Sequence, residues 1–188
     1  MAFDLGHALR RLRAQRAGPP PVRRHDAELP FVEKAAAVGP PLLLDTCVYL
    51  DVLQGRSPDA LDRLLGTRVS YHSAVCVAEL THAFGLLDPA HPGTRAVLAQ
   101  LSATVGDIPA RRIVVPDADA WGTAGALAGM LFRLGGFQAG QEKTCLNDAL
   151  IHLQARKAGL MLVTRNLRDF DLLDQLLPGG RLLFYRSA

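Results

Sequence analysis

The chain of 188 residues has few of the features that assign a sequence quickly to a functional class. Its three cysteines, Cys47, Cys76 and Cys145, are odd in number, widely spaced and set among apolar residues. This pattern excludes a disulfide framework and a cysteine-based zinc site, and it favours the reducing cytoplasm as the setting. We therefore interpret the three thiols as small buried side chains.

Long apolar runs and several nucleotide-related motifs are also missing. The apolar runs fall far short of the roughly 20 residues that a membrane-spanning helix needs, so no membrane association is expected. Residues 1–7 contain no basic segment followed by an apolar one, which argues against a secretory signal. Gly-x-x-x-x-Gly-Lys-Ser/Thr, Gly-x-Gly-x-x-Gly and Gly-x-Ser-x-Gly do not occur, which excludes the sites that depend on these motifs.

Excess positive charge is confined to the N-terminal region. The net charge is +3; residues 1–40 carry seven Lys or Arg against four acids, whereas the rest of the chain carries fourteen of each. A basic arm can steer a polyanion such as RNA toward a neutral catalytic body. The alternative is an arm that improves solubility or docks a partner protein, and the sequence does not separate these two interpretations.

The composition and pattern of the chain favour an α/β fold. Hydrophobic residues make up 49% of the sequence and give a mean hydropathy of +0.13, which suits a parallel sheet buried on both faces. Short apolar runs alternate with segments of helical spacing, as in β–α–β crossovers. Ser73 and Thr144 are expected to cap the starts of two helices, and Gly159 the end of one. Expected strands are 42–44, 68–71, 112–115, 160–163 and 181–184; expected helices are 47–54, 58–65, 74–84, 94–105, 118–134, 145–157 and 167–173.

The chain is expected to divide into an extension and one domain. Residues 1–40 form a basic N-terminal extension, with a helical piece at 3–17, a proline run and a second short helical piece at 30–38. Residues 41–188 form the domain proper, with a mostly parallel sheet between layers of helices.

Acidic residues at the ends of the expected strands suggest the chemistry. Asp45 directly follows the first strand, Glu79 lies in the second turn of the helix after the second strand, and Asp169 follows the fourth strand. Asp148 lies near the start of the helix that leads into the fourth strand. Ligands gather at the carboxyl ends of parallel strands, and charges among apolar neighbours are costly to desolvate unless something pairs with them. The four carboxylates therefore predict a Mg²⁺ or Mn²⁺ site suited to hydrolysis at phosphorus.

Each acid also has a purely structural interpretation. Asp45 could cap the following helix, Asp148 could complement the first turn of its helix, and Asp169 could lie in a solvated surface turn. Glu79 is the hardest to explain in this way, because its neighbours on both sides are apolar. The coincidence of all four acids with strand ends favours the metal site.

Four sequence blocks resemble those of PIN-domain ribonucleases, most closely the VapC-type toxins of toxin–antitoxin modules. They span about residues 42–173 in the family's order. The blocks are Leu-Leu-Leu-Asp45-Thr46-Cys-Val-Tyr-Leu, Ser73-Ala-Val-Cys-Val-Ala-Glu79-Leu, Asn147-Asp148-Ala-Leu-Ile and Leu-Val-Thr164-Arg-Asn166-Leu-Arg-Asp169-Phe170.

The resemblance implies a PIN-like three-layer α/β/α domain that cleaves RNA with Mg²⁺ or Mn²⁺. The four acids would hold the metal, with Thr46 and Asn166 as accessory polar groups beside it. The resemblance also implies a homodimer, neutralised by a cognate antitoxin whose tail occupies the acidic groove. The extension at residues 1–40 and the loop at 135–141 depart from the family's pattern.

We therefore predict a metal-dependent endoribonuclease that acts in the cytoplasm as the toxin of a bacterial type II toxin–antitoxin pair. One alternative is a non-catalytic PIN-like RNA-binding module. The retained carboxylates argue against it, because they would repel phosphates. The second alternative is a structure-specific DNA nuclease, for which the sequence offers no helical arch or second domain that could grip a duplex junction.

Overall fold

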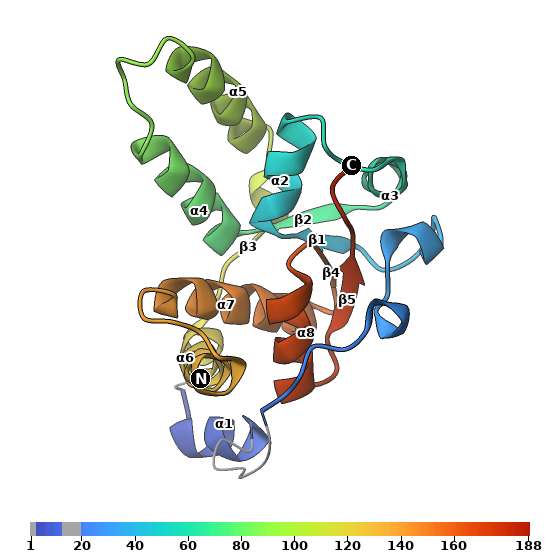
Figure 1. Ribbon diagram of the computed structural model, residues 1–188, viewed down its shortest axis with the longest axis vertical. Coiled ribbons are helices and arrows are strands. Elements are labelled where there is room, and N and C mark those ends of the chain that lie inside the picture. The colour runs from blue at the N-terminus through green and yellow to red at the C-terminus, as the bar shows by residue number, and fades with distance from the viewer. Residues whose placement is uncertain (1–2, 13–19) are drawn as a thin grey trace.

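A central sheet of five strands organises the domain in this computed structural model, which describes residues 3–12 and 20–188. The strands are β1 (Leu42–Leu44), β2 (Ser70–Ser73), β3 (Ile113–Val114), β4 (Met161–Thr164) and β5 (Arg181–Phe184). Their order across the sheet is β3-β2-β1-β4-β5, and every neighbouring pair is parallel. Figure 1 shows the sheet between two layers of helices. This arrangement confirms the expected α/β fold with three layers and a parallel sheet.

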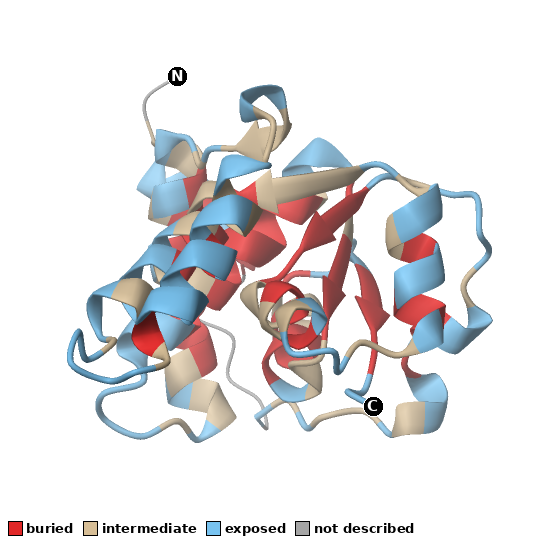
Figure 2. Ribbon diagram, turned by 90° about the horizontal axis from the view of Figure 1, so that it is seen from above, coloured by how far each residue is buried: buried red, intermediate tan, exposed pale blue. Residues whose placement is uncertain are grey.

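Helices lie on both sides of the sheet. On one side are α2 (Thr46–Leu53), α3 (Asp59–Thr67), α4 (Ala74–Gly85) and α5 (Thr94–Gly106). On the other are α1 (Leu5–Leu12), α6 (Ala118–Gly135), α7 (Glu142–Ala158) and α8 (Leu167–Leu176) (Figure 1). Short 3-10 turns occupy Asp26–Glu28, Val32–Lys34 and Ala110–Arg112. In Figure 2 the strands are mostly buried or of intermediate burial, while the helices present exposed residues outward, so the parallel sheet is largely shielded from water.

Strand β1 is buried on both of its faces. Leu42 and Leu43 are fully buried and Leu44 nearly so. Successive side chains of a strand point to opposite faces, so three buried leucines in a row require cover on both sides. Leu43 pairs with Tyr71 of β2 on one edge and with Leu162 of β4 on the other. This central position explains why a continuous apolar run predicted the strand.

Two of the three expected helix caps are confirmed. The Ser73 hydroxyl accepts a hydrogen bond from the Val75 amide at 3.0 Å at the start of α4, and Gly159 ends α7 with φ +65°. Thr144 was expected to precede its helix, and this is wrong. Helix α7 begins earlier, after Gln141, because the preceding glycine-containing loop is shorter than the sequence suggested.

The second strand begins two residues later than expected. Residues 68–71 were predicted, whereas β2 starts at Ser70. Arg68 is instead the C-terminal cap of α3, and its guanidinium donates to the Ala37 carbonyl oxygen at 3.3 Å. Because Arg68 caps α3 and bonds to this carbonyl, it is not part of the sheet, and β2 begins closer to α4.

Parts of the N-terminal extension pack against the domain. Helix α1 lies on α6 and buries Ala8 and Leu12, while Leu29 and Val32 belong to the main hydrophobic core. The expected helix at 3–17 is present up to Leu12, and its remainder lies outside the described residues. The second helical piece is a single 3-10 turn. A domain boundary at residue 40 stays a prediction.

A buried ion pair fastens this extension to α8. The fully buried Asp171 carboxylate accepts the Arg24 amide at 2.8 Å and the Arg24 Nε at 2.5 Å, and it also accepts Gln175 Nε2 at 2.9 Å. Arg23 pairs with Asp26 beside it. Two arginines of the basic arm therefore already have acidic partners, and steering of a polyanion by the arm stays a prediction.

The described residues bear on two further expectations. Within 3–12 and 20–188, no helix combines the length and hydropathy needed to cross a membrane. All three cysteines are free; Cys76 and Cys145 are buried as expected, whereas Cys47 is only half-buried. The cytoplasmic setting stays a prediction.

We expect Arg24→Ala to lower the free energy of unfolding by about 1–3 kcal/mol, because it leaves a fully buried carboxylate without its cation. Arg23→Ala is the matched control, and it should change stability little because both members of its ion pair are partly exposed. Urea unfolding of the two variants measures the difference. Equal effects of the two substitutions would contradict the role given to Arg24.

Candidate active site

The candidate site lies where the strand order of the sheet reverses. From β1 the chain adds β2 and β3 on one side and later returns to add β4 and β5 on the other. In such sheets the crevice beyond the carboxyl ends of the strands, at the reversal, is the usual ligand position. Asp45 follows β1 and Thr164 ends β4, so both lie at this point. The backbone amide of Asp45 also donates to the Val163 carbonyl oxygen at 3.1 Å.

Asp45 caps the helix that follows it, which is the structural role that the sequence left open for it. One carboxylate oxygen accepts the Thr46 amide at 2.7 Å and so caps α2. The other oxygen accepts the Thr164 hydroxyl at 2.6 Å and the Cys47 thiol at 3.1 Å. The carboxylate is buried, and burial raises its pKa; the three hydrogen bonds oppose this rise and the charge of Glu79 adds to it.

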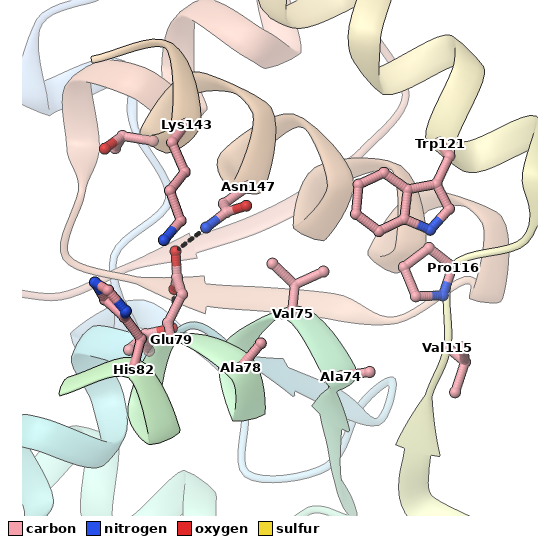
Figure 3. Close-up of a pocket in the computed structure, with 12 residues that line it drawn as sticks. Ala74, Val75, Ala78, Glu79, His82, Val115, Pro116, Trp121, Lys143 and Asn147 are labelled. Atoms are coloured by element: carbon pink, nitrogen blue, oxygen red, sulfur yellow. Dashed lines mark hydrogen bonds between the residues drawn. The ribbon is translucent and has the colours of Figure 1, made fainter. Parts of the chain in front are cut away.

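Glu79 is positioned from three elements of the fold. It projects from α4, one oxygen accepts the hydroxyl of Thr46 from α2, and the other accepts Nδ2 of Asn147 from α7 at 2.7 Å (Figure 3). Thr46 was expected to be an accessory polar group, and the structure places it between Asp45 and Glu79. The carboxylate is half-buried, so it faces the opening of the site.

Asp148 and Asp169 are joined by one amide. Nδ2 of Asn166 donates to Asp148 at 3.2 Å and to Asp169 at 3.0 Å. Asn166 also caps α8, because its Oδ1 accepts the Asp169 amide at 3.3 Å. The accessory position expected for Asn166 is thus between two of the four acids.

Asp148 is the most strongly perturbed carboxyl group of this set. It is buried, and burial raises its pKa well above the usual value. The charges of Asp45, Asp169 and Glu79 raise it further, and the hydrogen bond from Asn166 offsets only part. Since Asp148 responds to all three other acids, the fold brings the four predicted carboxylates into one electrostatic cluster.

The donors around this cluster differ from those around other buried acids. Asp171 is paired with Arg24, and fully buried Asp51 lies 3.1 Å from an Arg56 guanidinium nitrogen and 3.2 Å from Arg165 Nε. In the described part of the chain, Asp45, Glu79 and Asp148 have hydroxyl, thiol, amide and backbone donors but no ion pair with Lys or Arg. Asp169 forms one ion pair in this part of the chain, with Arg168, whose guanidinium is 3.9 Å from Oδ1.

This cluster of acids fits a hard divalent cation. Oxygens of Asp45 and Glu79 lie within 4.8 Å of each other and of the Cys76 sulfur. The pKa of Cys76 is raised well above its usual value by burial, and then by the charge of Asp45, so the thiol keeps its proton and is a poor ligand. Oδ1 of Asp169 is buried and accepts no hydrogen bond, and its ion-pair partner, the Arg168 guanidinium, is 3.9 Å away. Carboxylate oxygens are the ligands that Mg²⁺ and Mn²⁺ prefer.

The sequence missed two polar residues of this site and misjudged the place of a third. Asn147 orients Glu79, and Thr164 orients Asp45. The sequence offered one signal for each residue, since Asn147 directly precedes Asp148 and Thr164 ends a buried strand. Asp148 was expected near the start of its helix, but it lies two turns inside α7, which crosses the edge of the site.

The fold is similar to that of several solved structures. No protein-family model matches the chain, and no curated protein matches it. The FitAcB structure from Neisseria gonorrhoeae aligns with a TM-score of 0.55 and 22% identity, over 77% of this chain and 96% of that one. VapBC2 from Rickettsia felis, bound to a DNA fragment from its promoter, gives 0.53 and 20% over 77% and 98%. DNA-bound VapBC from Salmonella typhimurium gives 0.52 and 22% over 78% and 98%.

These findings correct the predicted family. The chain was expected to be a PIN-domain ribonuclease closest to the VapC-type toxins, and as a family assignment this is wrong. No family model supports it, and the similar structures are FitAB and VapBC complexes with only 20–22% identity. Identity at that level establishes a shared fold and nothing finer. The function has to be argued from the site itself.

We expect Asp45→Asn to be as stable as the wild type in metal-free buffer or more stable by on the order of 1 kcal/mol, because it removes one charge from a repelling cluster. Asp45 and Asp148 have a higher pKa folded than unfolded, so the wild type loses stability as pH rises from about 4 through these raised values. The advantage of the variant should therefore grow with pH.

Urea unfolding with EDTA at several pH values measures this difference. Asp171→Asn is the control, since it removes charge from an acid that has an arginine partner, and it should be destabilising. A marked loss of stability in Asp45→Asn would show that capping of α2 dominates its role.

Proposed function

We propose that the chain is a metal-dependent nuclease that hydrolyses phosphodiester bonds of RNA. The observation that carries this proposal is the contrast among buried acids. Asp171 and Asp51 have arginine partners, whereas Asp45, Glu79 and Asp148 are oriented by uncharged donors and keep their mutual repulsion. Such an arrangement is costly without a cation, and it lies at the ligand-binding edge of the sheet. In addition, the sequence contains neither the Gly-x-x-x-x-Gly-Lys-Ser/Thr loop nor the Gly-x-Ser-x-Gly motif.

The proposed metal ligands are the four acids, and the uncharged neighbours set their orientation. Thr46 and Asn147 hold the two oxygens of Glu79, and Thr164 holds Asp45. A divalent cation bound there supplies a water of lowered pKa and stabilises charge on phosphoryl oxygens. Asn166 bridges Asp148 and Asp169 and so holds the two carboxylates close to each other.

The biological setting proposed for this activity is a toxin–antitoxin pair. The similar structures are FitAB and VapBC complexes, and two of those described above contain DNA. By analogy of fold, this chain would be the nuclease component, with a cognate antitoxin as its partner and a homodimer as its assembly. Leu86, Val97 and Leu98 on the α4–α5 pair are exposed apolar side chains that suit a protein partner.

We expect the purified chain, freed of any partner, to cleave RNA with Mg²⁺ or Mn²⁺ and to lose cleavage in EDTA. Asp45→Asn and Asp148→Asn should each lower the rate by at least about a hundredfold, because each removes a ligand charge. Asp107→Asn, an exposed acid at the end of α5, is the control and should keep the wild-type rate.

Gel analysis of a labelled RNA measures these rates, with duplex DNA of the same sequence run in parallel. Cleavage that persists in excess EDTA would rule out the metal mechanism. Preferential cleavage of DNA would favour the DNA nuclease alternative. RNA binding without metal-dependent cleavage would favour the non-catalytic alternative.

The roles of Asp169 and Asn166 are separable by their dependence on metal. Asp169→Ala removes a ligand oxygen, and we expect it to raise the Mg²⁺ concentration needed for half-maximal cleavage. Asn166→Ala removes a positioning group and a helix cap, so it should cost about 10–100-fold in rate and about 0.5–2 kcal/mol in stability. Magnesium titrations of the rate, together with urea unfolding, distinguish the two. If Asn166→Ala instead raised the Mg²⁺ concentration needed for half-maximal cleavage and Asp169→Ala left it unchanged, the assignment would be reversed.

A further inference from the structure

A pocket of about 590 Å³ opens directly beside the candidate site. Its volume is within the range of small-molecule sites, roughly 300–1,000 Å³. We call it the Glu79–Trp121 pocket. It is mostly apolar, and its principal walls are formed by Val75, Ala78, Glu79, Pro116, Trp121 and Lys143. Since Glu79 belongs both to this pocket and to the acid cluster, a molecule that fills the pocket lies against the reacting bond.

One face of α4 forms the floor of this pocket. Figure 3 shows Val75 and Ala78 between Glu79 at one end and Trp121 at the other. Val75 precedes Glu79 by four residues, which is about 6 Å of helix rise. The apolar part of the pocket is therefore about one helical turn away from the acid cluster. A base on the nucleotide next to the scissile phosphate would have to extend over about this distance.

An aromatic ring stands at the apolar end of the pocket. Trp121 projects from α6 with its ring beside Pro116, and 49% of its surface is exposed. A large indole left exposed in this way costs hydrophobic free energy, which points to a ligand rather than to the core. Aromatic faces of this kind stack on the bases of single-stranded nucleic acids regardless of sequence.

Positive charge is found at the other end of the pocket. Lys143, in the first turn of α7, directs its ammonium group toward the Glu79 carboxylate, and His82 of α4 lies on the opposite side (Figure 3). An exposed lysine next to an acid cluster gives the mouth of the pocket a group that attracts phosphate. Along the pocket, the aromatic ring, the apolar floor and the lysine follow one another in the same order as the base, the sugar and the phosphate of a nucleotide.

We propose that the Glu79–Trp121 pocket binds one unpaired nucleobase of the RNA, adjacent to the bond that is cut. The base stacks on Trp121, and Lys143 contacts the flanking phosphate. This inference rests on the proposed nuclease function and adds its substrate class, single-stranded RNA. A base inside a duplex has both faces covered by its neighbours and is unable to stack on the indole.

The chain contains one tryptophan, so its fluorescence reports on Trp121 alone. Asp45→Asn protein in Mg²⁺, which binds without cutting, is titrated with a short single-stranded RNA. We expect saturable quenching of the indole emission. The same RNA annealed to its complement should give no comparable quenching.

Binding of a labelled RNA to variants in the same background gives a second measurement. We expect Trp121→Ala to weaken affinity about fivefold to a hundredfold, since it removes one stacking contact. Trp121→Phe keeps an aromatic face and should remain close to the parent protein. Val69→Ala, just before β2, is the control, an exposed apolar residue outside the pocket whose loss should leave affinity unchanged.

The outcomes separate this inference from the proposed function. If wild type cuts RNA with Mg²⁺, yet RNA binding neither quenches the indole nor responds to Trp121→Ala, the pocket does not hold a base and the nuclease function stands. Equal quenching by the duplex also overturns the inference. If wild type neither binds nor cuts RNA, the proposed function fails and this inference fails with it.

Discussion

The cost of holding four carboxylates together is the constraint on which the rest of the site depends. Burial and mutual repulsion raise the pKa of Asp45 and Asp148, and the surrounding hydrogen bonds remove only part of that cost. Elsewhere the same chain satisfies buried Asp171 and Asp51 with arginines. Of the four acids only Asp169 has an arginine near it, with the Arg168 guanidinium 3.9 Å away. An arginine bonded to Asp45, Glu79 or Asp148 would stabilise the fold but would also occupy the place of a cation. The choice of uncharged donors therefore keeps the site open at the expense of stability.

The sequence predicted those features of the fold that depend on local chemistry, but it did not predict the element boundaries that depend on tertiary contacts. The run of leucines in β1, the Ser73 cap and the Gly159 stop are local signals, and the structure has each of them. The start of α7 and the start of β2 depend on how a loop closes and on where Arg68 finds a carbonyl partner. No periodicity in the sequence encodes those contacts.

The family assignment failed for a different reason than the element boundaries. Short blocks around acids at strand ends describe a local geometry, namely a strand that ends in a ligand-bearing turn. Asp45 follows β1 and Asn166 follows β4, on the two strands between which the strand order reverses, and such positions do not establish ancestry. With 20–22% identity to the similar structures, what is shared is the arrangement of elements. The case for catalysis therefore rests on charges and donors, which belong to this chain alone.

The site and the pocket beside it are positioned by one buried polar link. Ser73, which caps α4, donates to Gln154 of α7 at 2.5 Å, and Gln154 Nε2 donates to the Val114 carbonyl oxygen of β3 at 2.9 Å. Both side chains are buried, so leaving either unpaired would be costly. Helix α4 carries Glu79 and the pocket floor, and α7 carries the groups that orient Glu79 and complete the acid cluster. Because this link and the Asn147–Glu79 hydrogen bond both join α4 to α7, the distance between the acids and the apolar pocket is set by the fold itself.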